Sequence, residues 1–151
     1  MMEVIEHPKE TDMGRVMVKA KLTNYDDIAR HRAGEIPSEQ IRGVEKDGLV
    51  DTGATMLVLP EDVTQQLGLS IVREVNVTYA DGRREKRRIA RGVVIEIIGR
   101  DALVDAVVEA PGARILIGQV PLEVMDLIVD PKAGTVGPRP ESPDAPLIEI
   151  Y

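Results

Sequence analysis

The chain has 151 residues, which is enough for one compact domain with short tails and too few for two full domains with separate cores. It contains no Cys, Phe or Trp, which excludes a disulfide framework, a thiol nucleophile and thiolate metal sites, and leaves the core to aliphatic residues that favour β-sheet. The formal net charge of -7 argues against a general nucleic-acid binder, and no apolar run reaches the ~20 residues that span a bilayer. Since the start also lacks a signal-peptide pattern, we expect a cytoplasmic protein with neither nucleic-acid nor membrane partners.

The first part of the chain predicts a polar leader, one strand and a charged insertion. Residues 1–13 form the leader, and we place the folded domain at residues 14–137. Apolar and polar side chains alternate over residues 16–22, which is the pattern of a half-buried strand in a hairpin or at a sheet edge. Residues 24–47 are rich in charge and contain Gly and Pro, so we predict a surface insertion there, with a helical turn at residues 25–32.

The middle of the chain predicts two buried strands, a short helix and a hairpin. Residues 48–60 have apolar arms on both sides of a polar turn, as expected for strands that flank a functional loop. The segment 61–69 begins with acidic residues and has a glycine in the stopping position, which predicts a short helix. A hairpin is expected from 72 to 98 and a strand at 103–109. In this hairpin the residues expected to point inward are Val75, Val77 and Tyr79, and those expected in the turn are Asp81 and Gly82.

The last third of the chain predicts a helix and an extended arm. The apolar run at residues 114–118 precedes a segment, PLEVMDLIVD, that fits a short helix with Pro121 in its first turn. A turn and a strand are expected at residues 131–136. Residues 138–151 are rich in proline, which favours an extended arm, and its last five residues form a possible terminal strand.

The sequence Asp51-Thr52-Gly53-Ala54 lies between the two buried strands predicted for residues 48–60. A polar turn with a glycine that lets the backbone approach another group closely is suited to peptide hydrolysis. The tripeptide alone is a weak signal, because about 2% of chains this long contain a given tripeptide by chance. An ordinary turn in which Asp51 caps backbone amides is the simpler interpretation of the tripeptide by itself.

Three features around this turn occur together and in a fixed order: the flanking apolar strands, a hairpin with an Asp-Gly tip, and residues 115–118 (ILIG) directly before a short helix. With them the chain resembles the retropepsin-like (retroviral-type) aspartic proteases from about residue 14 to residue 137. The resemblance implies a mostly β fold: a folded-over, barrel-like sheet with one short functional helix after the ILIG segment.

The resemblance also implies a homodimer, because the chemistry needs two carboxylates and this chain has a single DTG. The two copies of Asp51 would share a proton across the two-fold axis. One would activate a water that attacks a peptide carbonyl of a peptide or protein substrate, and the other would protonate the product groups. No metal or cofactor is required by this mechanism.

The family's site residues carry over to nine further positions. Thr52 would brace the two loops across the dimer, and the backbone of Gly53 would lie against the carboxylate. The positions expected to bind substrate are Ala54, Thr55 and Leu116 in the cleft, and Tyr79, Ala80, Asp81 and Gly82 in the hairpin, the flap, that closes over it.

Two features allow more than one interpretation. Thr55 and Gln119 are both neutral where family members usually have an Asp–Arg ion pair, and a hydrogen bond between them is one possible replacement. This departure supports an alternative function, a catalytically weak or inactive dimerisation or peptide-binding module. The basic segment 83–91 fits a solvated strand face, and it also fits a flap that favours acidic peptides or an acidic segment of the same chain.

Overall fold

The computed structural model describes residues 16–150, so the predicted leader at residues 1–13 lies outside the described residues. The described chain is mostly β, as predicted. The strands are β1 (Val16–Asn24), β2 (Gly43–Val50), β3 (Leu57–Pro60), β4 (Ser70–Thr78), β5 (Arg84–Ile97), β6 (Arg100–Glu109), β7 (Leu116–Ile117), β8 (Leu127–Asp130) and β9 (Thr135–Pro138). The helices are α2 (Tyr25–Arg32), α3 (Glu61–Leu67), α4 (Gln119–Met125) and the short 3-10 helix η1 (Ser38–Gln40).

Seven strands form one sheet that closes on itself. Their order is β1-β2-β7-β3-β6-β5-β4, and β1 also pairs with the second half of β5, where Leu22 lies opposite Ile95. The predicted strand at residues 16–22 is confirmed, and it forms an antiparallel pair with β2. It is not an edge strand, because β5 is long enough to pair with β4 through its first half and with β1 through its second. The barrel-like sheet is therefore confirmed.

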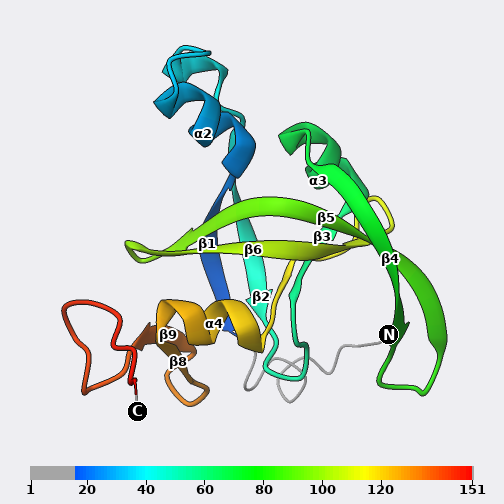
Figure 1. Cartoon of the computed structure of the whole chain (residues 1–151). Helices are drawn as coiled ribbons and strands as arrows, with labels where there is room; N and C mark the ends of the chain where they lie inside the picture. The colour runs from blue at the N-terminus through cyan, green and yellow to red at the C-terminus, as the bar shows by residue number, and fades with distance from the viewer. Residues whose placement is uncertain (1–15, 151) are drawn as a thin grey trace.

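The core fills the space inside this closed sheet with aliphatic side chains. Fully buried residues from five different strands meet there: Leu22, Leu57, Leu59, Ile95, Ala106 and Ile117. Helices α2 and α3 lie beyond one side of the β5–β6 ribbon, and α4 with the small β8–β9 sheet lies beyond the other (Figure 1). None of the helices among residues 16–150 has the length and apolar character needed to cross a membrane.

The predicted insertion at residues 24–47 is shorter than expected. Its helical turn is a two-turn helix, α2, and its last five residues belong to β2, because Val44 and Lys46 pair with β1 across the sheet. The insertion is fixed by an ion pair in which the Arg42 guanidinium donates two hydrogen bonds to Asp27, at 2.9 and 3.0 Å. The Arg42 side chain thereby holds the pKa of Asp27 below its ordinary value.

The predicted helix beginning near Pro121 is also shorter than expected. Pro121 lies in the first turn of α4, as predicted, but the helix ends at Asp126, which has a left-handed backbone conformation with φ 57°. Residues 127–130 form β8, which pairs with β9 in a hairpin. The apolar pattern of this segment fits a helix as well as a strand. Its β-branched residues favour a strand, and pairing with β9 decides between the two.

The C-terminal arm is held against the end of α4. The Asp126 carboxylate accepts hydrogen bonds from the Arg139 side chain and from the Leu147 amide, the latter at 2.9 Å. The buried guanidinium of Arg100 donates to the carbonyl oxygens of Asp126, at 2.9 Å, and of Ser142. These contacts join the arm to the body of the domain as far as Leu147.

The end of the arm forms no strand within the described chain. The side chains of Ile148 and Ile150 are 76% and 90% exposed. The strand considered possible at residues 147–151 is thus absent from residues 147–150 of a single copy, and Tyr151 lies outside the described residues. Docking of this segment on a second copy stays a prediction.

Candidate active site

The Asp51 loop, residues 51–56, is held between three strands. Strand β7 lies between β2 and β3, and Ile117 pairs with Val50 on one side and with Leu57 on the other. The Asp51 amide donates a hydrogen bond of 3.0 Å to the Ile117 carbonyl. The two predicted strands that flank the loop are therefore confirmed, and β7 fixes the point at which Asp51 leaves β2.

The Asp51 carboxylate is oriented by its own loop. The Gly53 amide donates to Asp51 Oδ1 at 3.0 Å, and the Ala54 amide donates to the Asp51 carbonyl at 3.0 Å. Asp51 is half-buried, whereas Thr52 and Gly53 are exposed. Within the described chain Oδ2 has no hydrogen-bond partner, so this oxygen is free to act on a water, a substrate or a group from another molecule.

Gly118 brings the start of α4 into direct contact with the Asp51 loop. The amides of Gln119 and Val120 donate to the carbonyls of Ala54 and Thr55, at 2.8 and 2.9 Å. A Cβ on Gly118 would lie 2.6 Å from the Ala54 carbonyl oxygen, so only glycine allows this approach. Sequence reasoning did not identify Gly118 as a site residue, although a glycine between an apolar strand and a helix was the available signal.

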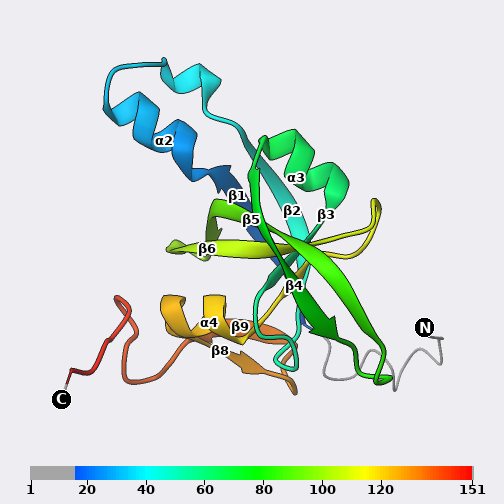
Figure 2. The same ribbon diagram turned by 45° about the vertical axis from the view of Figure 1, so that its right-hand side comes forward.

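The turn expected to act as a flap lies between β4 and β5. The Tyr79 amide donates to the Arg83 carbonyl at 2.8 Å, and Gly82 has φ 87°, as the predicted Asp-Gly turn requires. Ala80, Asp81 and Gly82 are exposed. This turn and the loop between β2 and β3 lie at the same end of the molecule, away from α2, in both views (Figure 1, Figure 2).

Tyr79 makes contacts that the sequence did not predict. Its hydroxyl donates a hydrogen bond to Glu109 at the end of β6, and Arg87 Nε donates to the other carboxylate oxygen at 3.1 Å. Partial burial, and then the Glu109 hydrogen bond, raise the pKa of Tyr79. Glu109 and Arg87 are therefore site candidates that sequence reasoning missed, because 30 residues separate Glu109 from Tyr79.

The comparison with protein families gives the decisive observation. The family described as "gag-polyprotein putative aspartyl protease" matches residues 38–123, which is more than half of the chain. The chain belongs to this aspartyl protease family. The matched range contains the Asp51 loop, the β4–β5 hairpin and Gly118, and the resemblance to retropepsin-like proteases is confirmed. No curated protein matches the chain.

The side-chain hydrogen bond considered as one possible replacement between Thr55 and Gln119 is not formed within the described chain of this aspartyl protease. Both residues are exposed, and their segments are joined only through the backbone hydrogen bonds of Ala54 and Thr55 with α4. Leu116, expected in the cleft, is half-buried at the start of β7, opposite Leu49 of β2 and Val58 of β3. The residues expected to form the site thus lie on segments that are joined by backbone hydrogen bonds.

The basic segment 83–91 is partly neutralised within the chain. Arg83 pairs with Asp81 at 3.2 Å, and Arg88 pairs with Glu61 at 3.2 Å. The side chains alternate along β5, so that Arg84, Lys86 and Arg88 are exposed and the residues between them are half-buried. This alternation fits a solvated strand face. A preference of the protease for acidic peptides stays a prediction.

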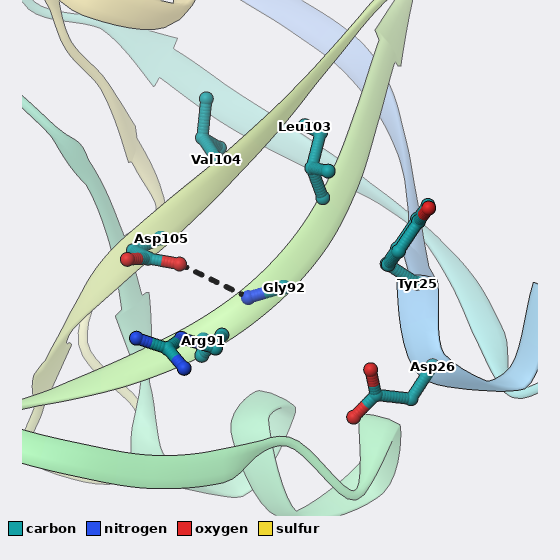
Figure 3. A pocket seen from close by; sticks show the side chains of 7 residues that line it. All are labelled: Tyr25, Asp26, Arg91, Gly92, Leu103, Val104 and Asp105. Atoms are coloured by element: carbon teal, nitrogen blue, oxygen red, sulfur yellow. Dashed lines mark hydrogen bonds between the residues drawn. The ribbon is translucent and has the colours of Figure 1, made fainter. Parts of the chain in front are cut away.

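One hollow lies away from the Asp51 loop, at the base of α2. Its volume is about 390 Å³, and its lining comes from the start of α2, from β5 and from β6: Tyr25, Asp26, Arg91, Gly92, Leu103, Val104 and Asp105 (Figure 3). Asp105 accepts a hydrogen bond of 3.1 Å from the Gly92 amide and so fixes the bend of β5. Two acids, Asp26 and Asp105, line this wide-open hollow, and Asp105 already accepts from the backbone, so we assign no protease chemistry to it.

Proposed function

We propose that the protein is an aspartic endopeptidase that acts as a homodimer, with one Asp51 from each copy in a shared site. The observation that carries the proposal is the position of the Asp51 carboxylate. It stands at the end of β2 on an exposed loop, one oxygen held by the Gly53 amide and the other without a partner in the described chain. Membership of an aspartyl protease family supports the same chemistry.

A single carboxylate does not complete this chemistry. Hydrolysis of a peptide bond needs a base that takes a proton from water and an acid that gives a proton to the leaving nitrogen. Two carboxylates at hydrogen-bonding distance supply both, because their mutual repulsion keeps one proton on the pair. This chain has one DTG sequence, so the second carboxylate comes from a second copy.

The other expected site residues receive roles around this pair. Thr52, exposed at the tip of the loop, braces it against the partner's loop, and Ala54, Thr55 and Leu116 border the substrate. The flap closes over the bound peptide with its exposed tip, Ala80, Asp81 and Gly82.

The test is cleavage of an unfolded protein by the purified chain, with and without an inhibitor that mimics the tetrahedral transition state. Asp51→Asn is nearly isosteric but cannot act as a base, so we expect kcat to fall by about 10²–10⁴-fold while circular dichroism and sedimentation stay unchanged. Undiminished cleavage by this variant would remove Asp51 from the mechanism.

A mixing experiment tests the second copy. Adding an excess of the Asp51→Asn variant to wild-type protein converts wild-type dimers into mixed dimers, each with a single active carboxylate. We expect the wild-type activity to fall with the fraction of mixed dimers. Activity that does not respond to the variant, under conditions where sedimentation of labelled chains shows exchange, would contradict the shared site.

One observation favours the alternative function, a peptide-binding or dimerisation module without turnover. Thr55 and Gln119, which occupy the positions of a family ion pair, form no side-chain hydrogen bond with each other in the described chain. In that case the wild-type protein would bind the inhibitor and a peptide but release no products. Inhibitable cleavage excludes this alternative.

A further inference from the structure

Glu109, the last residue of β6, is hydrogen-bonded to the β4–β5 hairpin. The chain that follows Glu109 leads to the strands that hold the Asp51 loop. From this geometry we infer that Tyr79, Arg87 and Glu109 form a latch that sets the position of the β4–β5 hairpin over the cleft. These three residues are called the hairpin latch below. The inference rests on the proposed function for its role in catalysis, whereas the latch itself is a property of the fold.

Both oxygens of Glu109 are used by the hairpin. Tyr79 donates to Oε2 through its hydroxyl, and Arg87 donates to Oε1 through Nε at 3.1 Å. The side chains of Arg87 and Glu109 are only 23% and 18% exposed. Hydrogen bonds to a partly shielded carboxylate are stronger than those between neutral groups, and they are less screened than surface ion pairs.

Two cations of the same hairpin lie against the Tyr79 ring. The Arg83 guanidinium lies 4.3 Å from the ring centre, and the Arg87 guanidinium lies 5.6 Å from it. Both distances are in the range of cation–π contacts. The ring therefore cannot turn freely, and its hydroxyl is directed to Glu109 by packing as well as by the hydrogen bond.

The latch lies on the more buried face of the hairpin. Val75 and Val77 alternate with exposed neighbours along β4, and they pair across the hairpin with Arg87 and Glu85. Tyr79 continues the same half-buried series. The hairpin closes its own turn through the bond of the Tyr79 amide to the Arg83 carbonyl, so the latch is not needed to form the turn. It decides how the finished hairpin lies against the domain.

Glu109, on the domain side of the latch, is connected to the strands that hold the Asp51 loop. Glu109 is the last residue of β6 and pairs with Pro60 at the end of β3. The turn that follows is fixed by a hydrogen bond of 2.9 Å from the Gly112 amide to Asp62. This turn leads into Ile115, whose carbonyl accepts from the Leu49 amide at 2.9 Å, two residues before Asp51. One short stretch of backbone thus connects the flap's anchor with the strand that carries the carboxylate.

A hairpin released from Glu109 should spend less time in the position that covers substrate. When only a fraction of molecules is competent to bind, the apparent affinity falls by that fraction, while the rate of the bound complex is unchanged. Loss of the latch should therefore raise KM and leave kcat nearly unaltered. Tyr79, Arg87 and Glu109 are positioning residues in this scheme, acting through the flap.

The test uses Tyr79→Phe, which removes only the hydroxyl, and Glu109→Gln, which removes only the charge. Matched controls are Tyr25→Phe, at the base of α2, and Glu96→Gln, on an exposed part of β5. Amide hydrogen exchange of residues 75–87 is measured in an Asp51→Asn background, so that this readout does not depend on turnover. We expect about tenfold faster exchange in each latch variant and no change in the controls, since each variant loses a hydrogen bond involving a charged group.

Kinetics and the double variant complete the test. KM should rise several-fold in both latch variants, with kcat within about twofold of wild type. The double variant should match the worse single variant, because both changes affect the same hydrogen bond, that of the Tyr79 hydroxyl with Glu109. Exchange equal to the controls, or faster exchange with an unchanged KM in a protein that cleaves, would overturn the inference. If the latch variants exchange faster than the controls but the wild-type protein cleaves nothing, the result would support the latch and count against the proposed function.

Discussion

Gly118 lies against Met56 so closely that a Cβ on Gly118 would come 2.4 Å from the Met56 carbonyl oxygen. The same Cβ would lie 2.8 Å from the carbonyl carbon of Thr55. These obstacles are backbone atoms of the Asp51 loop, which cannot rotate away as a flexible side chain can. The start of α4 and the loop that carries Asp51 are thus fitted to each other through a single glycine.

Gly118→Ala should therefore destabilise the fold and displace the Asp51 loop. We expect the free energy of unfolding in urea to fall by about 1–3 kcal/mol or more, as for overpacking in a closely packed interior. Gly137→Ala is the matched control, because nothing lies within 4 Å of a Cβ at that position, and its effect should stay within about 0.5 kcal/mol. Equal stability of the two variants would show that the loop can yield to a methyl group.

Gly82→Val should weaken catalysis through the flap. Gly82 has φ 87° and open space around it, so a larger residue meets no obstacle and suffers only from its backbone conformation. A β-branched residue is strained there by about 1–2 kcal/mol, whereas Asn tolerates positive φ, so kcat/KM should fall about tenfold in Gly82→Val and little in Gly82→Asn. The flap assignment fails if both variants retain wild-type kcat/KM.

The carboxylate of Asp126 should make stability depend on acid pH. The Ser142 hydroxyl, then the Arg139 guanidinium and the Leu147 amide, hold the pKa of Asp126 far below its ordinary value. Because the folded pKa is the lower one, its contribution is complete above the unfolded value of about 4 and is lost as the pH falls toward the folded value. Urea midpoints should therefore drop below pH 4.

The variant Asp126→Asn identifies this carboxylate as the cause. It should be less stable than wild type at pH 7 and should lose less stability between pH 7 and pH 3. Asp101→Asn serves as the control, because Asp101 is exposed and its carboxylate makes no hydrogen bond or ion pair in the described chain. A wild-type drop that persists in full in Asp126→Asn would assign the pH dependence to other groups.

Deleting residues 148–151 should weaken the dimer without unfolding the monomer. The deletion removes the exposed side chains of Ile148 and Ile150 but keeps the contacts of Asp126 with Arg139 and Leu147. If the segment adds to the sheet of a second copy, sedimentation should show a larger dissociation constant, and activity should fall on dilution. An intact dimer with faster cleavage would instead identify the segment as a cover of the cleft.

The alternation of apolar residues predicted several elements correctly. It located β1, the strands on both sides of Asp51, and the β4–β5 hairpin with its turn at Asp81 and Gly82. The same reasoning extended the helix after Gly118 into residues 127–130, since a short apolar run fits either a helix or a strand. The left-handed conformation of Asp126 and pairing with β9 decided for the strand.

The site residues divide in the same way. The tripeptide at Asp51 and the segment before α4 were recognisable because their meaning lies in short stretches of sequence. The contact of Tyr79 with Glu109 crosses 30 residues, and each partner alone has the appearance of an ordinary surface residue. The basic segment also gave no hint of the pairing of Arg87 with Glu109.

By itself the sequence determined the aspartyl protease motif at Asp51, on which the proposal of a second copy rests, and the periodicity that makes the chain mostly β. These properties are local, because strand and turn preferences act within a few residues of the chain. Only the tertiary structure decided that β1 closes the sheet on β5, that Gly118 touches the Asp51 loop, and that Tyr79 bonds to Glu109. Such contacts depend on strand register, and the register is set when the whole core packs at once.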